Sequence, residues 1–281
     1  MKFFNRKNKI LSHDTIVNDS KRIIGQDTPF AVTEAYRSLC TNVLYISVED
    51  KCKKICVTSA LSGEGKTSVS INFARTLAEH SDSIKVLLVD ADMRKSRISR
   101  LLPEIEDDSH GLTEYLAGID QEPNIISVPG TSLSLITSGA ESVNPAALLN
   151  SSKMRQLIEN LEEKFDYIIF DTPPVNVVSD AVVLNEFVNG YLLVVRADYS
   201  DIRSISSAID SLEQVGANIF GFVLDSLNLK YDHKYKRRSG AYGDSISKYG
   251  SNYYSAHKNA EEKNVLPQEG ETTAAKDAAQ E

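Results

Sequence analysis

The chain has 281 residues, 41% of them apolar and 25% charged, which is typical of an ordinary globular protein. Its formal net charge of −8 argues against nonspecific binding to nucleic acid. No apolar run approaches the roughly 18–20 residues that span a bilayer, and the basic N-terminus lacks the apolar stretch of a secretory signal. The three cysteines, Cys40, Cys52 and Cys56, match no metal-ligand spacing and indicate reduced thiols in a structural role.

Composition along the chain predicts three regions. Residues 1–30 form a polar, basic segment, and residues 31–228 carry strongly patterned segments that we expect to form one domain. Residues 229–281 are expected to form a flexible tail, rich in tyrosine at its start and acidic at its end.

Within the middle region, short β-branched apolar runs alternate with amphipathic helical patterns. Strands are predicted over 53–60, 84–92, 133–139, 165–174, 190–197 and 218–225. Helices are predicted over 65–80, 154–161 and 202–216. Strands that are apolar throughout and alternate with helices indicate an α/β fold. Its sheet should be doubly wound and mostly parallel, with helices on both faces.

The first predicted strand leads directly into "SALSGEGKTS" (59–68), which ends as a phosphate-binding loop of the type G-x-x-x-x-G-K-[ST]. Glycines let backbone N–H groups point at phosphate oxygens, and the following helix adds its positive end. Lys66 can bridge the β- and γ-phosphates of ATP, and Thr67 can offer its hydroxyl to Mg²⁺. Ala60 replaces the first glycine, which costs little where φ is negative. The fold is therefore expected to be of the P-loop NTPase type. The residues expected to bind the nucleotide are Ser62, Gly63, Glu64, Gly65, Lys66, Thr67 and Ser68.

Two other predicted strands end in carboxylates. Asp90 and Asp92 lie on one side of the extended "VLLVDADMR", and Asp171 ends "YIIFD". Ligands of doubly wound sheets bind at the carboxyl ends of the strands, and Mg²⁺ takes hard oxygen ligands. One or two of these carboxylates would hold the metal, which leaves another to orient or deprotonate an acceptor. Arg94 follows the pair and could contact phosphate or form a surface salt bridge.

Six of the chain's twelve tyrosines gather near its end, between residues 231 and 254: Tyr231, Tyr235, Tyr242, Tyr249, Tyr253 and Tyr254. Their spacing follows neither the alternation of a strand nor the period of a helix. Glycine, serine, asparagine and basic residues separate them, so nothing in the composition draws the rings into a core.

Taken together, these features resemble the bacterial tyrosine kinases that accompany capsule and exopolysaccharide synthesis. In that family "SGEGKTS" is the Walker A motif, "VLLVDADMR" the Walker A′ motif and "IIFDTPP" the Walker B motif. "HGLTEYLAG", "NPAALLNSSKM" and "SDAVVLNEF" also match. The resemblance covers about residues 31–228, and the tyrosine tail fits it. The chain is similar to the Gram-positive type, in which the kinase and its membrane-spanning adaptor are separate chains.

The resemblance implies a protein-tyrosine autokinase that transfers the γ-phosphoryl group of ATP to the tail tyrosines and regulates polysaccharide synthesis. Lys66 and Mg²⁺ would hold the phosphate charge. Thr67 and Asp171 would hold the metal, and Asp90 would reach it directly or through water. A phenol of pKa about 10 needs a nearby base, for which Asp90 is the first candidate and Asp92 the second.

It also implies partners and a location. The kinase would be cytoplasmic and recruited to the inner face of the membrane by a transmembrane adaptor of the polysaccharide co-polymerase type. A cognate phosphotyrosine phosphatase and a homo-oligomer are expected. The family's oligomerisation motif E-x-x-R-x-x-R is represented by Glu34 and Arg37, but Cys40 replaces the second arginine, so assembly should be weaker or built differently. Glu34 and Arg37 could equally form an ordinary surface pair.

Two alternatives remain open. A MinD-like or ParA-like ATPase would act as a dimeric switch, but it carries an additional lysine where this chain has Leu61. The tyrosine tail also argues against it. The second alternative is a noncatalytic scaffold that nucleotide gates and whose tail is phosphorylated by another kinase.

Overall fold

The computed structural model describes residues 22–25, 27–81, 83–103, 105 and 109–226. The predicted tail with its six tyrosines and most of the basic N-terminal segment lie outside these residues. The boundaries placed at residues 30 and 228 therefore stay predictions.

A seven-stranded sheet organises the described residues, in the order β3-β4-β2-β5-β1-β6-β7. Its strands are β1 (Lys53–Ser59), β2 (Val86–Asp90), β3 (Ile126–Ser127), β4 (Leu133–Ile136), β5 (Tyr167–Asp171), β6 (Gly190–Arg196) and β7 (Ile219–Asp225). All neighbours pair in parallel except β3, which is antiparallel to β4. The prediction of a mostly parallel α/β sheet is confirmed, and each of the six predicted strands is present.

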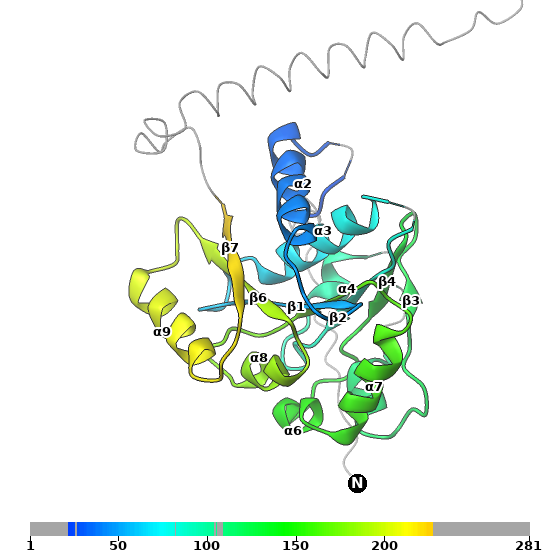
Figure 1. Cartoon of the computed structure of the whole chain (residues 1–281). Helices are drawn as coiled ribbons and strands as arrows, with labels where there is room; N and C mark the ends of the chain where they lie inside the picture. The colour runs from blue at the N-terminus through cyan, green and yellow to red at the C-terminus, as the bar shows by residue number, and fades with distance from the viewer. Residues whose placement is uncertain (1–21, 26, 82, 104, 106–108, 227–281) are drawn as a thin grey trace, which may run out of the picture. The chain divides into compact units, whose positions relative to one another are not determined.

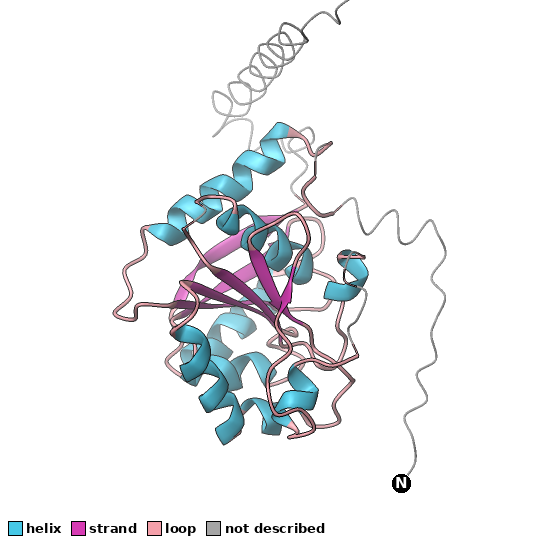
Figure 2. Ribbon diagram, turned by 90° about the vertical axis from the view of Figure 1, so that its right-hand side faces the viewer, coloured by secondary structure: helices cyan, strands magenta, loops and turns pink. Residues whose placement is uncertain are grey.

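Helices cover both faces of the sheet (Figures 1 and 2). One face carries α2 (Phe30–Leu44), α3 (Lys66–Ala78) and α4 (Ile98–Leu101). The other carries α5 (Leu112–Leu116), α6 (Pro145–Leu149), α7 (Ser152–Glu162), α8 (Asp180–Val183) with a 3-10 turn (Leu184–Glu186), and α9 (Ile202–Glu213). None of the described helices is long and apolar enough to cross a membrane.

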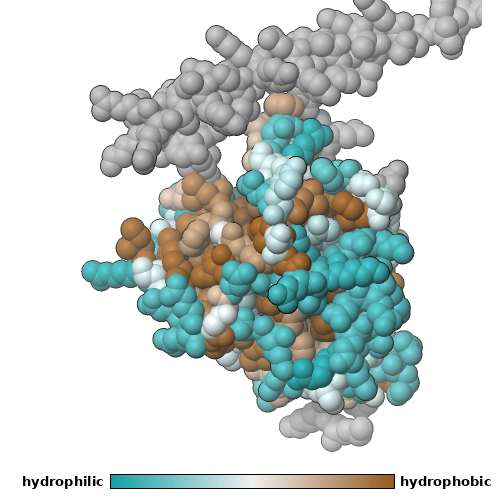
Figure 3. All heavy atoms as spheres, viewed as in Figure 1, coloured by the Kyte–Doolittle hydropathy of each residue, from teal (hydrophilic) through white to brown (hydrophobic). Residues whose placement is uncertain are grey.

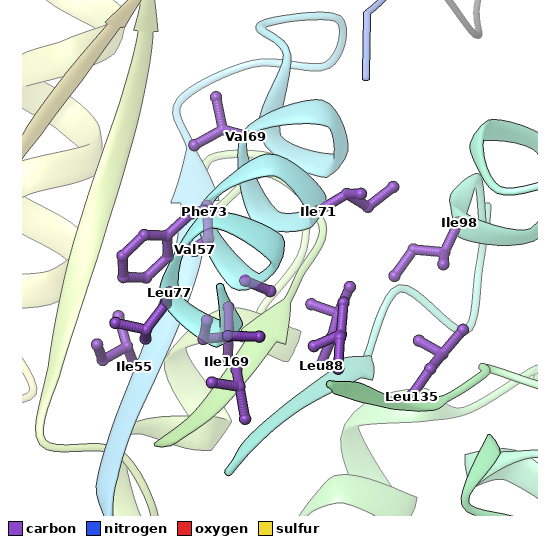
Figure 4. Packing of buried hydrophobic residues seen from close by; sticks show 14 of the residues in the cluster. Ile55, Val57, Val69, Ile71, Phe73, Leu77, Leu88, Ile98, Leu135 and Ile169 are labelled. Atoms are coloured by element: carbon purple, nitrogen blue, oxygen red, sulfur yellow. The ribbon is translucent and has the colours of Figure 1, made fainter. Parts of the chain in front are cut away.

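The central strands bury both of their faces. On β5, Ile169 packs toward α3, while Ile168 and Phe170 belong to the cluster on the opposite face. Figure 4 shows Phe73 and Leu77 of α3 close to the side chains of the strands beneath them. Because residues on both faces are apolar, these strands read as continuous apolar runs in the sequence. The result is a rigid platform for the loops at their carboxyl ends.

The edge strand β7 is less covered than the centre of the sheet. Phe222 is 55% exposed and Leu224 49%. Figure 3 shows apolar residues gathered on the side of the molecule where β7 lies.

Candidate nucleotide-binding site

The phosphate loop connects β1, at the centre of the sheet, to the first turn of α3. Gly63 and Gly65 both adopt the left-handed backbone region, with φ of +90° and +92°. A Cβ at Gly65 would also collide with the Asp225 carboxylate at the end of β7, so only glycine fits there. Lys66 is the first residue of α3, and the N–H groups of that turn therefore face the loop.

A cavity of about 260 Å³ lies over this loop. Six of the seven loop residues predicted from the sequence line it: Ser62, Gly63, Gly65, Lys66, Thr67 and Ser68. Asp92 is the acidic residue of the lining, and lysine or arginine side chains make up most of the remainder. Its shape and charge suit a polyphosphate, as the motif predicts.

Glu64, the seventh predicted residue, points away from the cavity. Its side chain is fully buried, and its Oε2 accepts the Leu61 N–H at 2.7 Å. The hydroxyl of Ser200 donates to its Oε1 and accepts the Arg196 N–H at 2.8 Å. The Arg196 guanidinium in turn donates to the Gly63 carbonyl at 3.3 Å.

These contacts tie the loop that follows β6 to the phosphate loop. Ser200 and Arg196 were not predicted from the sequence, because "RADYSD" (196–201) matches no nucleotide-binding motif. Glu64 stays a predicted nucleotide-binding residue only through its backbone, since its side chain braces the loop.

Asp90 and Asp171 lie next to each other at the ends of β2 and β5. Asp171 Oδ1 accepts the Ser70 hydroxyl at 2.9 Å, and the Thr67 hydroxyl beside the carboxylate lowers its pKa. Asp90 Oδ2 accepts the Ser96 hydroxyl at 2.5 Å, and its Oδ1 accepts the backbone N–H of Asp92 at 3.1 Å.

Burial dominates the titration of this pair. It raises the pKa of Asp171 to about 6, although Lys66 and the hydroxyls of Thr67 and Ser70 act in the opposite direction. Burial also raises the pKa of Asp90 well above its usual range, and the neighbouring Asp171 carboxylate raises it further.

Of the three predicted carboxylates, Asp92 is the one that reaches the cavity. It is half-buried, and its Oδ1 accepts the Lys95 N–H at 3.0 Å. Asp90 is fully buried beneath the cavity. Arg94 forms a two-pronged ion pair with the buried Asp180, at 2.8 and 3.0 Å, so it is a structural salt bridge.

The residues present fit a magnesium ion bound with nucleotide. The Thr67 hydroxyl and the Asp171 carboxylate are hard oxygen donors beside Lys66, the set that Mg²⁺ takes together with phosphate oxygens and water. In the described part of the chain, no group of three or more His, Cys, Asp or Glu side chains could hold a metal without phosphate. Asp90 is already engaged by Ser96, which suits a supporting position behind the metal ligands.

On α2, Glu34 and Arg37 form an exposed ion pair at 2.6 Å, as in the surface-pair alternative. Cys40 is fully buried, and its thiol donates to the Phe73 carbonyl at 3.8 Å. Position 40 therefore faces the core of its own chain, where an arginine would not fit.

Comparison with known proteins identifies relatives of this chain. A family model described as an AAA domain matches residues 52–220. The tyrosine-protein kinase CpsD of Streptococcus pneumoniae is 38% identical over 211 residues, which cover 75% of this chain and 88% of that protein.

Solved structures agree with that relationship. The kinase domain of the Escherichia coli tyrosine kinase ETK has a TM-score of 0.64 at 33% identity, over 75% of this chain and 86% of that one. The cell division ATPase MinD of Pyrococcus furiosus has a TM-score of 0.52 at 28% identity, over 61% and 71%. The P-loop NTPase fold is thereby confirmed.

Proposed function

Because this chain belongs to the bacterial tyrosine-protein kinases of the CpsD type, we propose that it transfers the γ-phosphoryl group of ATP to tyrosine hydroxyls, those of its own tail included. The observation that carries this proposal is the convergence of Lys66, Thr67 and Asp92 on one cavity above the phosphate loop. A nucleotide switch needs only Lys66 and Thr67, whereas phosphoryl transfer to a phenol also needs a carboxylate within reach of the acceptor.

Lys66 and the backbone N–H groups from Gly63 to Thr67 bind and orient the phosphates. Thr67 and Asp171 would hold Mg²⁺, which neutralises charge on the β- and γ-phosphates when it is bound. Ser70 lies within hydrogen-bond distance of both Asp171 and the Lys66 carbonyl, so it fixes the carboxylate against the first turn of α3.

We assign the general base to Asp92 in preference to Asp90. Asp92 lines the cavity, and the Lys95 N–H holds one of its oxygens, which orients the other. Both oxygens of Asp90 accept hydrogen bonds beneath the cavity. Asp92 would accept the phenol proton as the tyrosine oxygen attacks phosphorus, while Asp90 holds the Asp92 backbone in place.

The acceptors would be the six tyrosines between residues 231 and 254. Support comes from the place where the chain leaves the described domain. The side chain of Asp225, at the end of β7, lies against Gly65, so the last described strand ends beside the phosphate loop. A segment of about 25 residues has an r.m.s. span of roughly 25–30 Å, which is enough to reach the site of a neighbouring chain.

The partners follow from the family alone. The kinase would act as a homo-oligomer at the cytoplasmic face of the membrane, switched on by the cytosolic segment of a transmembrane adaptor and reversed by a phosphotyrosine phosphatase. Such an adaptor would shift the population of loop conformations toward the ATP-binding state and supply no chemistry.

Mass spectrometry of purified protein incubated with Mg-ATP and the adaptor segment tests the proposal. Wild type should acquire phosphotyrosine between residues 231 and 254, Lys66→Met should acquire none, and the exposed Lys85→Met should match wild type. ATP hydrolysis without phosphotyrosine would favour the MinD-like switch. Nucleotide binding with neither reaction would favour the scaffold.

A further inference from the structure

A hydrogen bond between the side chains of Asp90 and Ser96 closes the residues between them into a loop. The Ser96 hydroxyl donates to Asp90 Oδ2 at 2.5 Å, and Asp90 is fully buried. A hydroxyl bound to a carboxylate at about 2.5–2.7 Å makes a stronger hydrogen bond than two neutral groups do. Residues 90–96, here called the carboxylate loop, are thus closed by a single side-chain contact at their base.

Both ends of the carboxylate loop are fixed. Asp90 is the last residue of β2, near the centre of the sheet. Ser96 lies two residues before Ile98, the first residue of α4, and Ile98 is fully buried in the core cluster that includes α3. Figure 4 shows Ile98 beside the strands that carry Leu88 and Leu135. The Ser96 hydroxyl therefore donates from a rigid part of the domain.

The first half of the loop is held by the core. Ala91 and Met93 are 0% and 1% exposed. The Ala91 N–H donates to the Asp171 carbonyl at 2.8 Å, and the Met93 carbonyl accepts the Ser142 N–H at 3.0 Å. Asp92 lies between these two anchored residues, and its side chain reaches the cavity.

The direction of the Asp92 carboxylate depends on the second half of the loop. Its Oδ1 accepts the Lys95 N–H at 3.0 Å. Lys95 and Arg97 line the cavity, whereas the hydroxyl of Ser96, between them, is turned to the buried Asp90. Because Lys95 directly precedes Ser96, the bond from Ser96 to Asp90 also fixes the N–H group that orients Asp92.

We propose that Ser96 is a positioning residue for phosphoryl transfer. Its hydroxyl keeps the carboxylate loop closed, so that the Lys95 N–H holds the Asp92 carboxylate toward the acceptor tyrosine. This rests on the proposed kinase function and adds to it the residue that aims the base. A displacement of about 1 Å in a reacting group can cost on the order of 100-fold in rate, so a contact outside the cavity can control turnover.

A purely structural hydroxyl would have other consequences. The Ser96 hydroxyl also satisfies a buried carboxylate, and its loss from that role alone would lower stability. It would not lower the turnover of folded protein selectively. A positioning role predicts a loss of turnover that leaves nucleotide affinity intact and that depends on the presence of the Asp92 carboxylate.

The comparison of Ser96→Thr with Ser96→Val tests this, because threonine and valine have nearly the same shape and differ in the hydroxyl. The measurement is the initial rate of tyrosine phosphorylation at saturating Mg-ATP, with full-length protein, the adaptor segment and a temperature below every Tm. Ser96→Thr should stay within about threefold of wild type. Ser96→Val should lose about 10- to 100-fold, with the Kd for Mg-ATP within about twofold of wild type.

Two further variants guard against an effect of bulk. Ser96→Ala removes the hydroxyl without adding a methyl group and should behave as Ser96→Val. Ser211→Val, on the exposed side of α9, should match wild type. In hydrogen-exchange mass spectrometry, fragments that cover residues 91–95 should exchange faster in Ser96→Val than in Ser96→Thr.

A double-mutant cycle shows whether Ser96 acts through Asp92. In an Asp92→Asn background no base carboxylate is left to orient, so Ser96→Val should lower the remaining rate by less than about twofold. A loss as large as in the Asp92 background would show that Ser96 acts elsewhere and would overturn the inference.

Equal rates of Ser96→Thr and Ser96→Val in an active preparation would also overturn it, as would a parallel loss of rate and Mg-ATP affinity in Ser96→Val. These results would leave the proposed kinase standing. Absence of phosphotyrosine from wild type would instead overturn the kinase, and the role of Ser96 in phosphoryl transfer with it.

Discussion

Asp90 and Asp171 are register partners on adjacent parallel strands, and their side chains are 0% and 1% exposed. Burial raises the pKa of both carboxyl groups, and the Asp171 carboxylate raises that of Asp90 further. The metal-free domain therefore carries a local instability that a bound cation would remove.

The first prediction concerns that cost. Because the pKa of Asp171 is raised to about 6, the native state retains a proton that the unfolded state has released. The free energy of unfolding should fall as the pH rises from about 4 to about 6. At higher pH it should stay at this lower value. In EDTA at pH 7.5, Asp171→Asn should therefore stabilise the domain by on the order of 2 kcal/mol, or about 4–8 °C in Tm.

Thermal melts across the pH range check this. The gain should vanish near pH 4, where Asp171 is protonated in both states, and Asp210→Asn on the exposed face of α9 should show no such trend. Mg-ATP should raise the Tm of wild type and not that of Asp171→Asn. A variant with the same Tm as wild type throughout would mean that the buried pair carries no penalty.

Much of the fold was predictable because it depends on local pattern. The central strands have apolar residues on both faces, so runs such as "KVLLVD" are strands whatever the details of their neighbours. The phosphate loop was predictable because its glycines need positive φ and its lysine needs the first helical position, which are requirements of a few adjacent residues.

The rest depends on contacts between distant segments. Ser200 reaches Glu64 across 136 positions of the chain, and Arg94 reaches Asp180 across 86. Neither pairing can be predicted from the residues that neighbour its members in the sequence. The direction of Cys40 depends on the rotation of α2 against α3, so its match to an oligomerisation motif did not reveal that it faces the core.

The contact between Ser200 and Glu64 gives a second prediction. Ser200→Ala removes a donor to a buried carboxylate and releases the loop after β6 from the phosphate loop. The Kd for Mg-ATP should rise by about 5- to 30-fold, equivalent to about 1–2 kcal/mol. Titration with a fluorescent ATP analogue measures this, with Ser211→Ala on α9 as the matched control. Equal Mg-ATP affinity of wild type, Ser200→Ala and Ser211→Ala would mean that the contact between Ser200 and Glu64 does not stabilise the phosphate loop.

A third prediction concerns Arg94. Arg94→Gln leaves the fully buried Asp180 without its partner and should destabilise the fold by about 1–3 kcal/mol, less than for a fully buried pair because Arg94 is 37% exposed. Arg94→Lys should recover only part of the stability that Arg94→Gln loses, since lysine cannot form the two-pronged contact. Arg155→Gln breaks the exposed pair with Glu186 and should cost at most about 1 kcal/mol. Urea unfolding compares them, and equal stabilities of Arg94→Gln and Arg155→Gln would contradict this role.

Cys40 carries a fourth prediction. Burial raises the pKa of the Cys40 thiol to about 12, and likewise those of Cys52 and Cys56. All three should resist a thiol reagent at pH 8 in the native protein and react on unfolding. Cys40→Arg should lower the free energy of unfolding by about 3 kcal/mol or more, without enlarging the assembly, because the side chain has no exit to a neighbour.

Sedimentation and denaturation of Cys40→Arg, with the exposed Arg37→Ala measured in parallel, test whether α2 faces the core of its own chain or an interface between chains. A stable Cys40→Arg protein of larger mass would show that position 40 belongs to an interface between chains. A destabilised protein of unchanged mass is the expected result.

We propose that the cavity of one chain phosphorylates the tail of another. The most direct test of this transfer mixes Lys66→Met protein, whose tail is intact, with an active chain whose six tail tyrosines are phenylalanine, in Mg-ATP and the adaptor segment. The Lys66→Met chain should gain phosphotyrosine between residues 231 and 254, at a rate that rises with the concentration of the active chain. No phosphotyrosine on that chain, while wild type labels itself at a rate independent of concentration, would contradict the claim.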